Sequence, residues 1–70
     1  MSAKKVVIED GRSDNLYKVE EINRKHVIYH VRVGLLWDNP RNIGSATTFA
    51  DALAIVQAHA GCTRVRVGPW

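Results

Sequence analysis

The strongest pattern in the chain is an alternation of apolar and polar positions over residues 26–33. Every odd-numbered position in this segment is apolar: Val27, Tyr29, Val31 and Val33. The even-numbered positions, which include His30 and Arg32, are mostly polar. A period of two is typical of a β-strand in an antiparallel sheet with one solvated side. The pattern therefore predicts a strand whose odd-numbered residues face the core and whose even-numbered residues face solvent.

Shorter apolar stretches on both sides of this strand predict three more strands, over residues 4–9, 16–22 and 63–67. Residues 23–25, Asn-Arg-Lys, are short enough to connect two antiparallel strands as a hairpin. The last predicted strand alternates valine with arginine. We therefore expect Val65 and Val67 to face the core, and Arg64 and Arg66 to face solvent.

Residues 49–60 carry apolar side chains at helical spacing. One stripe along this segment is apolar: Phe49, Ala52, Leu53, Val56 and Ala60. Thr48 can cap the first turn with its hydroxyl, and the carboxylate of Asp51 suits the positive end of the helix dipole. Gly61 can adopt the left-handed conformation that ends many helices. The spacing predicts a helix over residues 49–60 with this stripe against the sheet.

Residues 38–45 are rich in turn formers, with Asn39-Pro40 and Gly44, and this composition predicts a loop. The element order is then β-β-β-α-β, which places the chain in the α+β class. We expect a three- to four-stranded, mainly antiparallel sheet with one helix packed on one face. With 70 residues, the chain is expected to form one small domain, residues 1–70. The partner and direction of the last strand stay open.

The outer side of the predicted helix is unusually apolar for a surface helix. Ala54 and Ala58 lie on this side, with Ile55 near its edge. One interpretation is that alanine serves there simply as a good helix former. The other is that Ala54, Ile55 and Ala58 contact a second chain, since small side chains permit close approach. A symmetric homodimer is the default form of such a contact.

The solvated side of the predicted sheet is a second candidate surface. It gathers four basic or titratable side chains: His30, Arg32, Arg64 and Arg66. A positive sheet face can follow a phosphate backbone, with nearby rings stacking on bases. However, alternation places Tyr29 on the core side, so the rings are poorly positioned for stacking. The alternative interpretation is an ordinary solvated face.

The predicted loop after the third strand is a third candidate, for a protein interface. It contains Trp37, Asn39 and Arg41. Trp and Arg are enriched among interface hot spots, and loops often carry function. The competing interpretation is that Trp37 closes the end of a thin core.

The charge and cysteine content narrow the setting of the protein. Ten Lys and Arg against seven Asp and Glu give a net charge of +3, which permits an anionic partner without requiring one. The single cysteine, Cys62, excludes a disulfide within the chain, which favours a reducing compartment. The N-terminal apolar run, residues 6–8, is too short for a signal-peptide core or a membrane span. We therefore expect a cytoplasmic protein with no membrane association.

Catalytic and metal chemistry find little support in the residue pattern. His26 and His30 would lie about 13 Å apart along a strand, too far to share an ion. His59 and Cys62 supply two ligands where a structural zinc site needs four. Cys62 follows a helix C-terminus, whose dipole disfavours a thiolate. We expect no enzyme activity, no catalytic residues, no metal, no cofactor and no small-molecule substrate.

The run Gly44-Ser45-Ala46-Thr47-Thr48-Phe49-Ala50-Asp51-Ala52-Leu53 follows a strand pair. It resembles small strand–strand–helix–strand modules found in partial ribonuclease-H-like antitoxins and in phage accessory proteins. The resemblance covers about a third of the chain and carries over no residue role.

These observations predict a small, cytosolic, non-enzymatic protein that acts through protein–protein contacts, with a second copy or an unidentified protein as partner. A phage or mobile-element accessory protein would fit this description. The alternative is a nucleic-acid-binding module that uses the basic sheet face.

Overall fold

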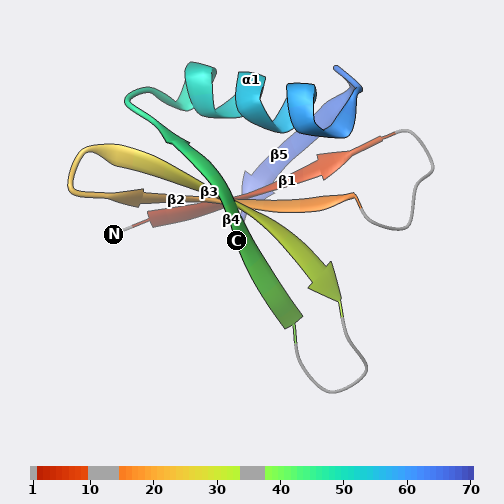
Figure 1. Ribbon diagram of the computed structural model, residues 1–70, viewed down its shortest axis with the longest axis horizontal. Coiled ribbons are helices and arrows are strands. Elements are labelled where there is room, and N and C mark those ends of the chain that lie inside the picture. The colour runs from red at the N-terminus through yellow and green to blue at the C-terminus, as the bar shows by residue number, and fades with distance from the viewer. Residues whose placement is uncertain (1, 10–14, 34–37) are drawn as a thin grey trace.

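The chain forms one antiparallel sheet of five strands with a single helix packed on one side (Figure 1). This computed structural model describes residues 2–9, 15–33 and 38–70. Its elements are β1 (Ser2–Ile8), β2 (Leu16–Ile22), β3 (Lys25–Val33), β4 (Asp38–Ala46), α1 (Phe49–Ala60) and β5 (Val65–Pro69). The strand order in the sheet is β4-β3-β2-β1-β5. The predicted α+β class is confirmed, with one strand more than the sequence suggested.

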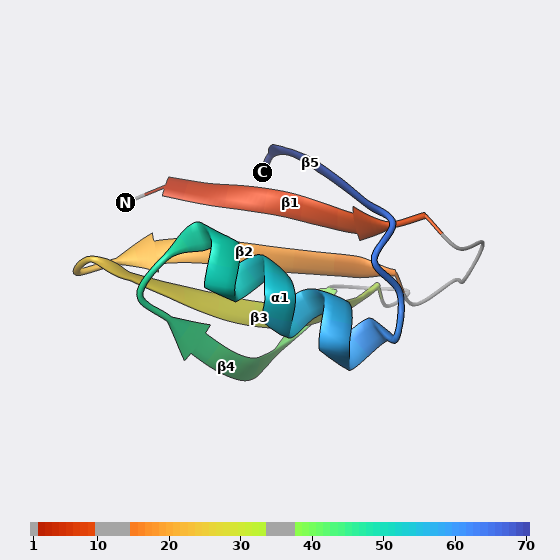
Figure 2. The same ribbon diagram turned by 90° about the horizontal axis from the view of Figure 1, so that it is seen from above.

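The helix carries the chain from one edge of the sheet to the other. The helix follows the edge strand β4 and packs on the sheet above β3 and β4. The chain then continues into β5 at the opposite edge (Figure 2). There β5 pairs antiparallel with β1, which answers the question that the sequence left open. Within the described ranges, no helix has the length and apolar character that a bilayer crossing requires.

The fourth strand corrects the prediction of a loop over residues 38–45. Pro40 cannot donate a backbone hydrogen bond, but β4 is an edge strand and pairs only with β3. Gly44 has a φ of 157°, which residues with side chains rarely adopt, and lies opposite Ile28 beside a β-bulge. The same residues that suggest a turn are therefore tolerated at a sheet edge.

The helix has the predicted bounds and the predicted caps. The Thr48 hydroxyl accepts a hydrogen bond from the Asp51 amide at 3.1 Å. Gly61 adopts the left-handed conformation with a φ of 69°, and its N–H donates to the Gln57 carbonyl. Ala52, Val56 and Ala60 of the predicted stripe are buried, and its two larger members pack against the same core.

The hairpin between β2 and β3 also matches the prediction. Its two turn residues, Asn23 and Arg24, have φ values of 50° and 65°. Two successive left-handed residues are what a two-residue hairpin turn of type I′ requires. The turn fixes the register of β2 and β3, in which Tyr17 pairs with His30 and Val19 with Ile28.

This register shows that the predicted orientation of β3 is wrong. Tyr17, Val19 and Ile28 are almost fully buried in the core beneath the helix. Because directly paired residues share a face, the even-numbered residues of β3 face the helix. Its odd-numbered residues, Tyr29 among them, face the other way. Both sides of β3 carry apolar side chains, so alternation alone could not identify the core side.

Candidate functional site

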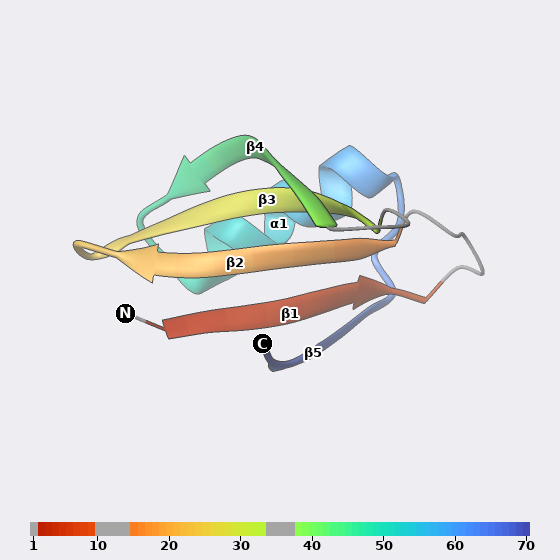
Figure 3. The same cartoon turned by 90° about the horizontal axis from the view of Figure 1, so that it is seen from below.

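The side of the sheet opposite the helix is covered by no described element, and we call it the open face (Figure 3). One row of paired residues crosses all five strands on this face: Gly68, Lys5, Lys18, Tyr29 and Asn42. The neighbouring row begins with Arg66, Val7 and Leu16. The open face therefore combines aliphatic, aromatic and basic side chains on a flat surface.

Trp70 lies over the middle of the open face. The Nζ atoms of Lys18 and Lys5 are 5.0 and 6.0 Å from the centroid of its ring. The Trp70 amide donates a hydrogen bond to the Ala3 carbonyl, which holds the C-terminal residue against β1. The side chain stays 46% exposed, so a large aromatic surface on this face faces solvent.

Apolar side chains lie in the row of the open face next to Lys18 and Tyr29. Val31 is only 2% exposed, yet it lies outside the core cluster beneath the helix. It pairs with Pro40 of β4, and Leu16 falls on its other side because Tyr17 pairs with His30. Val31 is therefore buried on the open side of the sheet, separately from the main core.

Two cations of the open face have carboxylate partners. Lys18 Nζ lies 3.5 Å from a carboxylate oxygen of Glu20, and Arg66 Nε lies 3.1 Å from one of Glu9. A hollow of roughly 230 Å³ is lined by Lys18, Glu20, Tyr29 and Pro40. Aromatic, apolar and charged side chains also occur together in protein–protein interfaces.

The structure separates the residues that the sequence placed on one basic face. Only Arg66 lies on the open face, where it pairs across from Val7. His30 faces the helix, and Arg32, two residues further on, falls on the same side. Arg64 precedes β5 and uses its carbonyl to accept from the Glu9 amide. The four side chains do not form a common surface, because the faces of β3 are the reverse of those predicted.

The residues predicted for a protein interface are also distributed over several surfaces. Ala54 and Ala58 are exposed on the back of the helix, as expected. Ile55 instead lies over β4, with side-chain carbons within 3.8 Å of the position that a Gly44 Cβ would occupy. Asn39 and Arg41 belong to β4, whereas Trp37 lies outside the described residues. Ile55 is therefore a packing residue and does not belong to the outer surface of the helix.

Three rings meet under the last turn of the helix. The Tyr17 hydroxyl and His59 Nδ1 are hydrogen-bonded at 2.7 Å. The ring of His30 stacks on that of Tyr17 with centroids 4.7 Å apart, and lies 5.3 Å from the ring of His59. Sequence reasoning missed this cluster because it depends on His30 facing the helix. No group of three metal-ligating side chains occurs among the described residues, this cluster included.

Tyr17→Phe removes the hydroxyl of this cluster and keeps the ring. We expect a loss of about 1 kcal/mol in the free energy of unfolding, because the hydrogen bond to His59 disappears from a part-buried site. Urea denaturation followed by circular dichroism measures this difference. Tyr29→Phe, on the open face, is the matched control and should change stability less. Equal losses in the two variants would show that the contact with His59 contributes nothing.

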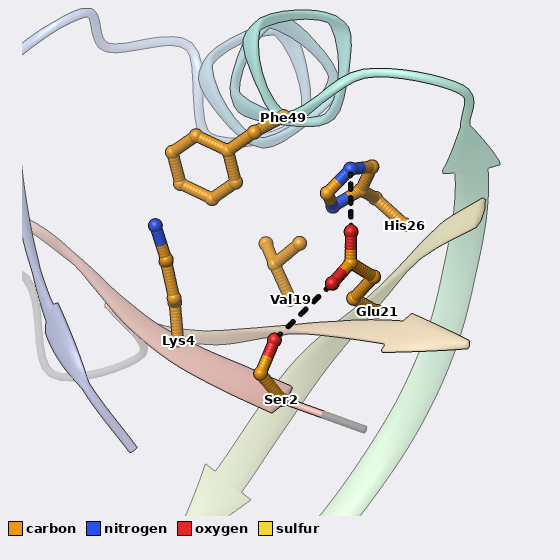
Figure 4. Close-up of a pocket in the computed structure, with 6 residues that line it drawn as sticks. All are labelled: Ser2, Lys4, Val19, Glu21, His26 and Phe49. Carbon is orange, nitrogen blue, oxygen red and sulfur yellow. Dashed lines mark hydrogen bonds and ion pairs between the residues drawn. The ribbon is translucent and has the colours of Figure 1, made fainter. Parts of the chain in front are cut away.

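A second hollow, of roughly 150 Å³, lies where the helix begins (Figure 4). Its lining comes from β1, β2, β3 and the first helical residue: Ser2, Lys4, Val19, Glu21, His26 and Phe49. The Glu21 carboxylate lies between Ser2 Oγ at 3.4 Å and His26 Nε2 at 3.8 Å. A serine nucleophile needs a general base, usually histidine, directly beside its hydroxyl. Here Glu21 separates Ser2 from His26, so His26 does not activate Ser2.

Lys4 extends over the Phe49 ring in the same hollow, with Nζ 4.7 Å from the ring centroid. The site therefore holds charges of both signs over an apolar floor, and Glu21 is largely exposed to solvent.

Comparison with known proteins identified no relative of this chain. No protein-family model, curated protein or solved structure matches it.

Proposed function

We propose that this protein is a non-enzymatic binding domain that docks a protein partner on its open face. The observation that carries the proposal is Trp70, which is 46% exposed and lies over the lysines of a sheet face that no described element covers. Trp, Tyr and Arg are the residue types most enriched in interface hot spots, and Trp70, Tyr29 and Arg66 share this face.

The size of the open face suits such a contact. The longest and shortest dimensions of the molecule, 32 and 19 Å, span the open face as it is seen in Figure 3. The smaller specific protein interfaces occupy roughly 600 Å² on each partner, which is comparable with one side of this sheet. The hollow beside Tyr29 and Pro40 can accept an anchoring side chain from the partner.

The charge pattern favours a protein over a polyanion on this face. Lys18 and Arg66 already have carboxylate partners, in Glu20 and Glu9. A phosphate backbone would have to compete with both carboxylates and would be repelled by them. A protein surface can present charges of both signs that complement such pairs.

We also propose a cytoplasmic location for this activity. Cys62 is the only cysteine of the chain, so the fold is not cross-linked internally. Small domains in oxidising compartments commonly depend on disulfides, whereas this one relies on a packed core.

Face-specific variants test the proposal. Tyr29→Lys introduces a charge at the centre of the open face, and Trp70→Ala removes the exposed ring at its surface. Ala54→Lys is the matched control, because it introduces the same charge on the back of the helix. Each chain is used as bait under chemical cross-linking, and the proteins recovered are quantified by mass spectrometry. We expect at least a tenfold loss of the partner with Trp70→Ala, as for other hot spots.

Retention of the same partner by Ala54→Lys, with its loss in both open-face variants, would support the proposal. Loss with Ala54→Lys alone would transfer the interface to the helix back and overturn it. Because Trp70 is exposed, Trp70→Ala tests binding even if Tyr29→Lys destabilises the sheet. Light scattering of the purified chain shows whether the partner is a second copy.

A further inference from the structure

A group of arginine and histidine side chains lies on the helix side of the sheet, near the C-terminal end of β3. We call it the arginine–histidine cluster: His30, Arg32, Arg41 and His59. Arg41 pairs directly with His30 across β3 and β4, so the two share a face. Arg32 follows His30 by two residues on the same strand and therefore lies on that face too. The contact between the His30 and His59 rings identifies the face as the helix side.

The two arginines are exposed and close together. Directly opposed residues in an antiparallel pair have Cβ atoms about 5 Å apart, and diagonal neighbours about 7–8 Å apart. Arg41 is opposite His30 and diagonal to Arg32, so both guanidinium groups can reach one ligand. Among the described residues, the carboxylates that form ion pairs are those of Glu9, Glu20 and Glu21. None of these pairs involves Arg32 or Arg41. In this respect the two arginines differ from Lys18 and Arg66 of the open face, which have carboxylate partners.

Behind the arginines, the imidazoles are held in place by the rings described above. His30 is fixed by stacking on Tyr17, and His59 by its hydrogen bond to the Tyr17 hydroxyl. The two imidazoles thus form the inner part of the cluster, with the exposed arginine side chains at its edge. The C-terminal end of β3 and the N-terminal end of β4 project away from the helix (Figure 1), so the helix does not cover the sheet there.

We propose that the arginine–histidine cluster binds the phosphate backbone of a single-stranded nucleic acid. Guanidinium groups bind phosphate oxygens through paired, charge-assisted hydrogen bonds. The donors follow neighbouring strands at the sheet edge and do not enclose a cavity, which suits phosphates along a chain better than one free ion. This site lies on the opposite side of the sheet from the proposed protein interface and does not depend on it.

Fluorescence anisotropy with a short labelled single-stranded DNA at a series of salt concentrations tests the proposal. The double variant Arg32→Gln, Arg41→Gln should weaken binding about tenfold at low salt. Each phosphate contact on a single strand contributes about 0.7 to the slope of log affinity against log salt, so the slope should fall by about 1.4. Both residues are exposed, and their replacement should leave the fold intact.

Arg24→Gln, Lys25→Gln is the charge-matched control. It removes the same two charges from exposed positions at the other end of β3, and should retain the affinity and the slope. Tripolyphosphate serves as competitor and separates a phosphate-ion site from a strand site. The proposal fails if the chain does not bind DNA at low salt, or if the control loses as much as the cluster variant. It also fails if tripolyphosphate displaces the DNA at equal phosphate concentration.

Discussion

Ile28→Ala is expected to lower the free energy of unfolding by about 3 kcal/mol, the largest effect of any alanine substitution considered for this chain. Ile28 has no exposed surface and lies between Val19 of β2 and Gly44 of β4, beneath the helix. Its truncation leaves a cavity that the surrounding strands cannot close. A domain of this size has a small core, so such a loss would bring the variant close to unfolding at room temperature.

Val27→Ala is the matched control, one residue away on the open face. Val27 is half-buried, and we expect its truncation to cost about 1 kcal/mol. Urea denaturation of the two variants, followed by circular dichroism, measures the difference. A larger loss for Val27→Ala would show that Val27, and not Ile28, faces the core. That is the orientation of β3 that the alternating pattern predicts.

Ile55→Glu is expected to destabilise the fold by about 2 kcal/mol, which is the second large effect. The Ile55 side chain is half-buried against β4, where Gly44 leaves room for it. A carboxylate at this position would lose contact with the strand and would be partly removed from water. At an exposed position of the helix, by contrast, substitution by glutamate would leave the fold unchanged.

Ala54→Glu supplies the comparison, since Ala54 is exposed on the back of the same helix. Glutamate is a good helix former, so stability should stay within about 0.5 kcal/mol of the parent chain. Thermal denaturation of both variants measures the contrast. If the two substitutions had equal, small effects, Ile55 would belong to the outer helix surface after all.

Elements with local signals could be predicted from the sequence almost to the residue. The helix begins after the Thr48 cap and ends at Gly61, and both caps lie next to the segment they terminate. The bounds of β2 follow in the same way from turn formers on each side. Such signals operate over four or five residues, and no distant contact is needed to interpret them.

Features that depend on pairing between distant segments could not be predicted. The fourth strand exists because β3 offers hydrogen-bonding groups to a segment that contains Pro40 and Gly44. The core side of β3 is decided by its register with β2, since Val27 and Ile28 are equally apolar neighbours. Alternation shows that a strand has two faces, but the identity of the buried one is a non-local property.

The same limit explains why sequence reasoning placed His30 and Arg32 on the open face and missed the residues at its centre. Its central row joins Lys5, Lys18 and Tyr29 from three different strands, and Trp70 joins them only because β5 pairs with β1. No spacing along the chain connects these positions. The arginine–histidine cluster is similar, since Arg41 meets His30 only through the unpredicted strand β4.

Lysine labelling of the chain with its protein partner bound tests the proposed interface most directly. Lys4 and Lys5 are neighbours in β1 but face opposite sides, one over Phe49 and the other near Trp70. Acetylation rates at each lysine can be compared by mass spectrometry between the free and the bound chain. We predict slower labelling of Lys5 and Lys18 in the complex, with Lys4 unchanged. Protection of Lys4 with Lys5 still reactive would place the partner on the helix side and contradict this account.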